Sequence, residues 1–228
     1  PSVRIHYHIQ DAGQVVNVVP DYSRIWVRVR DITREGLAPV YDQVRKMAGG
    51  AAIMANVDHK TSLISGIHDL LPNRTGGIVM QKNLEALGDI QYSEEEILFA
   101  LEMQENNGKP KIGIDGKIRP LRETLESPGG GSTDVGDVSY NVPVVSLAAT
   151  TAPKGVPWHS WSVVASSGMS IGHKGMLHAT KALGMTMVDI FKDENLRKEI
   201  KKEFDERIGD YKYDPFLDPG PPPIDYVD

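Results

Sequence analysis

Two histidines lie near each other in a chain that has only seven. They are His159 and His173, in the stretch KGVPWHSWSVVASSGMSIGHKGM over residues 154–176, and 173 − 159 = 14 positions separate them. Neutral imidazole is a common ligand of divalent metals. Because the chain has no cysteine, any metal must be held by His, Asp or Glu. Taken alone, each histidine could equally be structural.

A second candidate pair is Asn17 and Arg30, separated by 30 − 17 = 13 positions across a turn and a strand. Arginine offers a planar fork of donors that suits a carboxylate, and asparagine adds a neutral donor. This chemistry would suit the binding of a substrate carboxylate or carbonyl. The residues alone also allow the simpler reading, in which Asn17 makes a turn and Arg30 is a solvated strand end.

The glycine-rich run Gly129 to Asp134 (GGGSTD) is a third candidate, because glycine lets the backbone approach a ligand closely. Thr133 adds a hydroxyl at the end of this run. A flexible linker has a similar composition. Trp158 and Trp161 flank His159 and could pack in a core or form a wall against an aromatic substrate.

Composition excludes several classes of protein. The formal charge of −6 argues against a nucleic-acid partner, which requires clustered Lys and Arg. No apolar run approaches the roughly 20 residues that span a bilayer. We therefore expect no nucleic acid, no membrane and a cytoplasmic location.

The first part of the chain shows strand and helix patterns. Residues 3–9 and 24–30 alternate apolar and polar, which predicts two half-buried strands. Thr33 is a candidate N-cap for an amphipathic helix that Gly49-Gly50 would end, and residues 51–64 return to a strand-like alternation. This order is typical of the latter part of an open-faced α+β sandwich.

The second part begins after Leu71-Pro72-Asn73. Helices are predicted over 75–87, over 93–105 with a capping box at Ser93 and Glu96, and over 173–191. Residues 142–148 predict a strand buried on both faces, and the charged run after 191 a solvated helix. Residues 106–137 lack periodicity, and the remaining histidines have no assignable partner: His6, His8, His59, His68 and His178.

Four segments, in this order, resemble one known family: GQVVNVVPDYSRIWVRVR, LPNR, STDVGDVS and VPWHSW...SIGHKGM. The family is that of the M20-type metallopeptidases and amidohydrolases, which includes aminoacylases and carboxypeptidase G. The similarity is greatest to the aminobenzoyl-glutamate hydrolase branch. It covers nearly the whole chain but only the later half of a full-length member.

The resemblance implies an α/β fold, the C-terminal part of a two-domain metallohydrolase. Residues 1–68 would be the C-terminal part of a lid and dimerisation domain, a partial α+β sandwich. Residues 71–228 would be part of an α/β catalytic domain with a mixed sheet. Two divalent ions, zinc or manganese, would be bound there, and the assembled protomer would form a homodimer.

The same resemblance assigns roles to the candidate residues. His159 would be a metal ligand, and His173 would contact substrate at the edge of the pocket. Asn17, Arg30 and Thr133 would also bind substrate, the first two by reaching a neighbouring subunit's site. The remaining ligands and the general-base glutamate would lie on an N-terminal segment, so this segment carries no catalytic residue, and Asp134 and Asp137 cannot replace them.

We therefore expect part of a two-metal hydrolase that cleaves a C–N bond, the amide of an aminobenzoyl-glutamate-like or related small aromatic substrate. It would be active only with the N-terminal segment, and the strand-like start at Pro1 suggests cleavage of a longer polypeptide. Two alternatives stay open. The enzyme could deaminate an aromatic amine hydrolytically, or the chain could be a non-catalytic binding or regulatory subunit.

Overall fold

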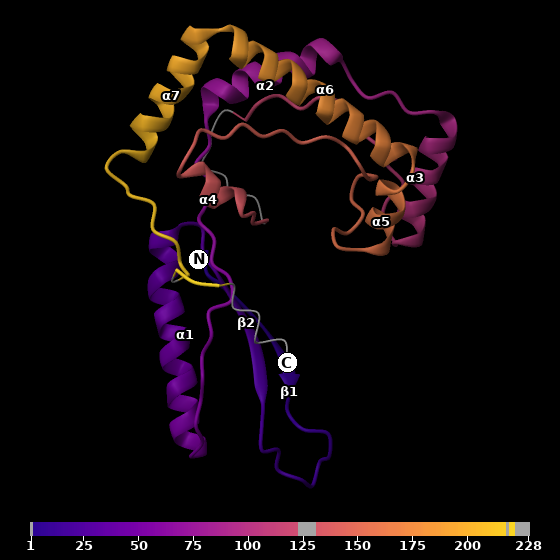
Figure 1. Ribbon diagram of the computed structural model, residues 1–228. Helices are drawn as coiled ribbons and strands as arrows, with labels where there is room; N and C mark the ends of the chain where they lie inside the picture. Colours follow the sequence, from indigo (N-terminus) through magenta and orange to yellow (C-terminus); the bar gives the residue numbers. More distant parts are fainter. Residues whose placement is uncertain (1, 123–130, 218, 222–228) are drawn as a thin grey trace. The chain divides into compact units, whose positions relative to one another are not determined.

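The computed structural model describes residues 2–122, 131–217 and 219–221 (Figure 1). The described residues form two compact units. One contains residues from 2–70, 131–141 and the segment after 211, and the other contains residues from 71–122 and 142–211. The chain mixes helix and strand. The lid and catalytic roles predicted for the two domains stay predictions. None of the described helices is both long and apolar enough to cross a membrane.

The first unit begins with an antiparallel hairpin of β1 (Arg4–Asp11) and β2 (Arg24–Arg30). Both strands lie where the alternation predicts them. The register pairs Tyr7 with Val27 and Ile9 with Ile25, so apolar side chains from both strands share one face. That face is exposed, with Tyr7 at 71%, so the predicted burial of one face of the hairpin is wrong for the described residues.

Helix α1 (Arg34–Ala55) follows, with Thr33 as the predicted N-cap accepting from the Gly36 amide at 3.2 Å. The predicted stop at Gly49-Gly50 is wrong, because the helix continues to Ala55. Asn56 ends it in the left-handed conformation, with φ 53°. The strand predicted over residues 51–64 is also wrong: its first half completes α1, and residues 57–64 have no regular structure.

The second unit is largely helical. It contains α2 (Arg74–Leu87), α3 (Glu94–Asn106), α5 (Trp161–Ser167), α6 (Ser170–Lys192) and α7 (Glu194–Ile208), while the short α4 (Val135–Ser139) belongs to the first unit. The capping box of α3 is confirmed, since Ser93 and Glu96 exchange both of its hydrogen bonds. The sequence did not predict α4 and α5.

Helices α2 and α6 enclose the core of the second unit. Met80, Leu84 and Ala182 are buried together, and the partly buried side chains of Val145 and Leu147 pack against them. A Cβ on Gly76 would overlap the Val145 side chain, so α2 rests closely on the 142–148 segment. Only Val145 and Leu147 of this segment pack against the core, so the predicted burial on both faces is wrong, and so is the predicted strand. A strand requires a hydrogen-bonded neighbour, and no described residue pairs with it in a sheet.

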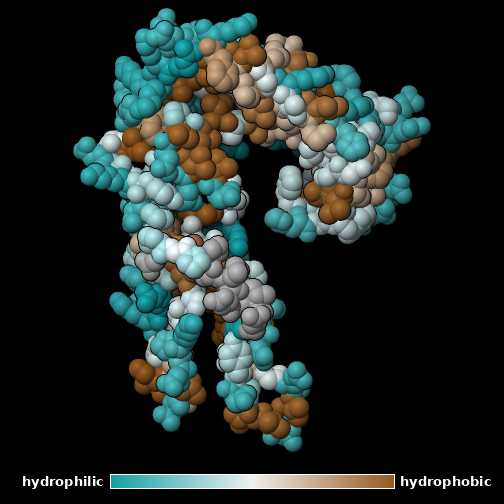
Figure 2. All heavy atoms as spheres, in the orientation of Figure 1, coloured by the Kyte–Doolittle hydropathy of each residue, from teal (hydrophilic) through white to brown (hydrophobic). Residues whose placement is uncertain are grey.

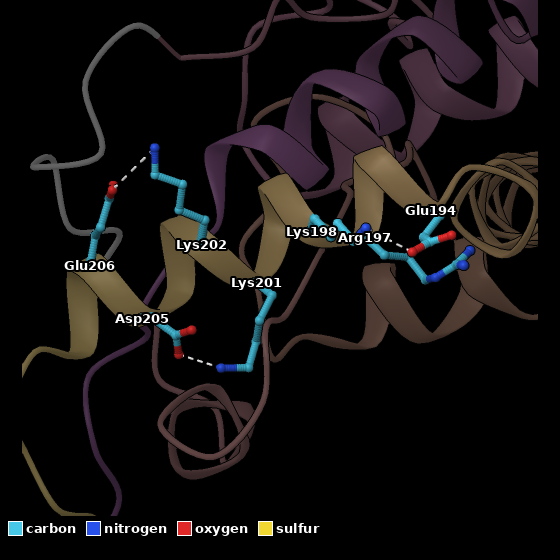
Figure 3. A pocket seen from close by; sticks show the side chains of 7 residues that line it. All are labelled: Glu194, Arg197, Lys198, Lys201, Lys202, Asp205 and Glu206. Atoms are coloured by element: carbon cyan, nitrogen blue, oxygen red, sulfur yellow. Dashed lines mark hydrogen bonds and ion pairs between the residues drawn. The ribbon is translucent and has the colours of Figure 1, made fainter.

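Helix α7 is solvated, as its charge pattern predicts. Figure 3 shows the side chains along its exposed face, where pairs four residues apart attract each other. Glu194 pairs with Lys198 at 2.8 Å, and Lys202 with Glu206 at 3.7 Å. These contacts support the helix locally.

One carboxylate on α7 binds the beginning of α2. Glu203 accepts from the backbone amides of Arg74 and Thr75 and from the Thr75 hydroxyl, each at 2.7 Å. It therefore satisfies donors that the first turn of a helix leaves unpaired. Burial by itself would raise the pKa of this carboxyl, but the hydrogen bonds from Thr75, Arg74 and Arg207 outweigh it and lower the pKa of Glu203 to about 2.

We expect Glu203→Gln to lower the free energy of unfolding at pH 7 by about 1–3 kcal/mol, because an amide cannot replace all the accepted hydrogen bonds. A lowered pKa stabilises the fold fully above the ordinary value of 4.5 and loses this effect as the pH falls toward 2. The difference in free energy of unfolding between wild type and variant should therefore shrink as the pH falls from 4.5 toward 2, which urea titrations at several pH values measure. Glu206→Gln, on the exposed face of α7, is the control, and an equal loss of stability there would contradict the assignment.

Candidate functional site

His159 lies at the tip of an exposed turn that precedes α5. Its φ is 61°, in the left-handed region that residues other than glycine rarely adopt. Val156, three residues earlier, is buried, and the Ser160 hydroxyl donates to the Pro157 carbonyl at 2.6 Å. Backbone strain of this kind is concentrated at functional sites.

The two tryptophans beside His159 lie outside the core. Trp158 is 74% exposed and Trp161 is 56% exposed. Of the two explanations that the sequence allows, core packing is therefore wrong. Exposed rings on either side of an exposed imidazole are suited to contact an aromatic ligand.

His173 lies in the first turn of α6, which begins three residues earlier than predicted, and it is exposed. Its neighbours fix the rotation of this turn. A Cβ on Gly172 would overlap the Ser167 carbonyl, and one on Gly175 would overlap the Thr150 carbonyl. Both glycines therefore allow backbone to approach the helix, while His173 faces solvent.

An ion pair binds the same turn of α6 to α3. Lys174 donates to Glu96 at 2.5 Å and to the Gln91 carbonyl at 2.9 Å. Burial by itself would raise the pKa of Glu96, but hydrogen bonds from Lys174, Ser170 and the Ser93 amide outweigh it and lower that pKa to about 2. The start of α6 is thus held from two sides.

A metal ion would need more ligands than this arrangement offers. Among the residues that the structure describes, no group of three or more His, Asp or Glu side chains is arranged to hold one. Zinc sites use three or four protein ligands. The His159 imidazole is exposed, and among the described residues no complete set of metal ligands surrounds it.

Asn17 and Arg30 belong to the first unit, and His159 and His173 belong to the second. Asn17 is exposed in the loop between β1 and β2, whereas Arg30 is partly buried at the far end of β2. The six residue steps of β2 place Arg30 roughly 20 Å from the start of the strand, and Asn17 lies in the loop before that start. Within one chain they are therefore not brought together.

The loop around Asn17 is markedly apolar. Figure 2 shows hydrophobic atoms gathered at the tip of the hairpin, where four valines are exposed: Val15, Val16, Val18 and Val19. Val16 is fully exposed, and Val19 is 91% exposed. Asn17 thus provides a polar group within an apolar protrusion.

Of the glycine-rich run, Gly129 and Gly130 lie outside the described residues. Thr133 is exposed, and its hydroxyl oxygen accepts from the Val135 amide at 3.3 Å. The same hydroxyl donates to Asp134 at 3.4 Å. Thr133 therefore supports the start of α4, and its exposure leaves it accessible to a ligand.

A buried histidine network in the first unit was not predicted from the sequence, which assigned His68 no partner. The ring nitrogen Nδ1 of His68 lies 2.7 Å from Asp137 Oδ1, and its Nε2 contacts the guanidinium of Arg34. Because a guanidinium only donates, Nε2 accepts and Nδ1 carries the proton. The Tyr213 hydroxyl donates to the same carboxylate oxygen of Asp137 at 3.1 Å.

Aromatic and charged groups surround this network. The His68 ring lies 5.0 Å from the Tyr140 and Tyr213 rings, and Arg34 stacks over Phe216 at 4.4 Å. These partners come from distant parts of the sequence, so no local pattern indicates them. The network joins the start of α1, residues 66–70, α4 and the segment after 211.

Two known proteins are similar to this chain. One is a subunit of the p-aminobenzoyl-glutamate hydrolase of Escherichia coli (strain K12), which is 31% identical over 227 residues, covering 89% of this chain and 47% of that protein. This similarity confirms the predicted resemblance to the aminobenzoyl-glutamate hydrolase branch. The other is the Xaa-Arg dipeptidase of Mus musculus, which is 24% identical over 207 residues, covering 90% of this chain and 41% of that protein.

The chain thus spans less than half the length of the relatives that it matches. Both relatives carry the names of enzymes that hydrolyse amide bonds. No protein-family profile matches the chain.

We expect His68→Ala to lower the free energy of unfolding by about 2–3 kcal/mol, because it opens a cavity and leaves buried polar groups of Arg34 and Asp137 without this partner. Urea titration of the protein, followed by circular dichroism, measures the change. His59→Ala, at an exposed position, should alter stability by less than about 0.5 kcal/mol. Equal effects in the two variants would show that the network contributes no more than a surface histidine.

Proposed function

We propose that this chain is the C-terminal portion of a two-metal hydrolase that cleaves a C–N bond. The observation that supports this most is the exposed, left-handed His159 turn between two exposed tryptophans, in a chain similar to a hydrolase subunit. The proposed substrate class is an aromatic amide of the aminobenzoyl-glutamate type. The name of the Escherichia coli relative and the exposed rings of Trp158 and Trp161 support that choice.

His159 would supply one imidazole ligand to a pair of zinc or manganese ions. When bound, such ions lower the pKa of a coordinated water and so provide a nucleophile at neutral pH. The accessible ring fits a ligand that meets donors from elsewhere, and the described residues provide no complete set around it. The general base and the remaining ligands would come from an N-terminal portion of the same hydrolase.

The need for an N-terminal portion has independent support. The chain spans 47% and 41% of its relatives, and one of them is named as a subunit. The hairpin also leaves an apolar face exposed, which is costly for an isolated two-stranded sheet. We propose that the assembled protomer forms a homodimer through the first unit, which carries this hairpin.

Four further residues would contact the substrate. Arg30 would bind a substrate carboxylate through its paired donors, and His173, in the first turn of α6, would form a hydrogen bond to the substrate. Thr133 would contribute a hydroxyl. Asn17 and Arg30 would each make their contact in the active site of a neighbouring protomer.

We expect His159→Ala in the assembled protein to abolish amide hydrolysis and to lower the bound metal below two ions per protomer. Metal content by mass spectrometry and release of glutamate from p-aminobenzoyl-glutamate measure the two effects. His6→Ala, on the exposed hairpin, should change neither. If His159→Ala retained both activity and metal, the ligand assignment would be wrong.

The same assays separate the alternatives. Ammonia released without glutamate would indicate hydrolytic deamination of the aromatic amine in place of amide cleavage. A wild-type assembly with neither metal nor turnover would indicate a binding or regulatory subunit.

We expect Arg30→Ala to raise KM for p-aminobenzoyl-glutamate roughly 10- to 100-fold with a smaller change in kcat, because a charged hydrogen bond contributes about 1.5–3 kcal/mol. Steady-state kinetics on the assembled enzyme test this. Arg28→Ala, two residues earlier on the same strand, is the matched control. An unchanged KM in Arg30→Ala would remove this residue from the substrate site.

A further inference from the structure

The end of α3 presents two side-chain amides to the segments around His159. Gln104 and Asn107 are three positions apart, which places them on the same face of a helix end. Neither residue was singled out in the sequence, because a glutamine and an asparagine within QENNGK are typical of a helix terminus. Their contacts distinguish them from ordinary surface amides.

Gln104 is completely buried, and its amide group uses its full hydrogen-bonding capacity. Its Nε2 donates to the carbonyls of Gly113 and Lys154, each at 2.8 Å. Its Oε1 accepts from the amides of Ile112 and Gly113 at 2.9 and 2.8 Å. Two donors and two acceptors are therefore satisfied, which binds the loop after α3 to the segment that leads to His159.

Asn107 supports the opposite side of the same turn. Its Oδ1 accepts from the Ser162 hydroxyl at 3.5 Å, and Ser162 lies 2.7 Å from the Ser160 hydroxyl. Ser160 in turn donates to the Pro157 carbonyl at 2.6 Å. Each hydroxyl has one proton, so Ser162 can donate to Asn107 or to Ser160 at a given moment. Ser162 is fully buried, so these contacts are shielded from water on its side.

His159 thus lies between two attachments to one helix. The first, at Lys154, is five residues before it, and the second, at Ser162, is three residues after it. Buried Val156 anchors the intervening segment, which leaves the imidazole exposed on a short, strained turn. A ligand on an otherwise free loop would lose conformational entropy on binding a metal, and these attachments reduce that loss.

We propose that Gln104 and, through Ser162, Asn107 are positioning residues that hold the His159 turn in the conformation that binds metal. This inference rests on the proposed role of His159. Neither amide would itself bind the metal or contact the substrate. They act through the backbone and hydroxyl groups on either side of the ligand.

The test compares zinc affinity among variants of the assembled protein, measured by competition with a chelator. Gln104→Met keeps the length of the side chain and removes all four hydrogen bonds, and we expect it to weaken zinc binding about 10- to 100-fold, the range found when the groups that orient a ligand are removed. Ser162→Ala deletes one buried hydroxyl, and we expect a smaller loss in the same direction. Because it changes so little volume, it keeps the test informative if Gln104→Met fails to fold.

Two comparisons make the outcome decisive. Gln81→Met, a matched change at a glutamine that bonds to Glu85 on the exposed side of α2, should leave zinc affinity unchanged. Asn107→Asp retains the acceptor for Ser162, so it should bind zinc more tightly than Asn107→Ala. If His159→Ala loses zinc while folded Gln104→Met and Ser162→Ala bind it as wild type does, the positioning role is wrong and the ligand assignment stands. If His159→Ala itself keeps zinc, the proposed function fails and this inference fails with it.

Discussion

A single buried amide determines much of how the second unit presents its candidate site. Gln104 has no exposed surface, and each hydrogen bond that its side chain makes is to backbone. A buried amide that lost these partners would incur the cost of desolvation without compensation. The loop after α3 and the segment before His159 are therefore fixed together, and α5 follows directly from that turn.

The first turn of α6, which carries His173, is also fixed by contacts with other segments. Two glycines allow close backbone contact, and the Lys174–Glu96 ion pair holds the turn against α3. Only the Glu96 side chain of this pair is buried, and breaking the pair would leave that carboxylate without its partner, so the contact constrains the geometry of the turn. The exposed direction of His173 follows from these contacts.

The first unit is held together differently. Neutral His68 joins Asp137 and Arg34, and further contacts extend to Tyr213 and Phe216. The residues of this network come from separate stretches of the sequence, because residues 131–141 and residues 212–217 return to the unit formed by residues 2–70. The hairpin, by contrast, keeps an apolar face exposed. The unit therefore combines a well-ordered polar junction with a surface suited to further association.

The sequence by itself determined the local elements and the resemblance. Caps at Thr33 and Ser93 depend on residues three positions away, and the alternation of β2 depends on neighbours two positions away, so local patterns predict them correctly. Local patterns failed where the structure of a segment depends on residues outside it. Residues 51–55 continue α1 instead of forming a strand, and residues 142–148 have no strand to pair with among the described residues. Of the candidate site, the sequence identified His159 and His173 by type and spacing. Only the tertiary structure revealed the strained turn, the amides of α3 that hold it and the His68 network, because hydrogen bonds between segments 50 to 70 residues apart leave no periodic signal in the sequence.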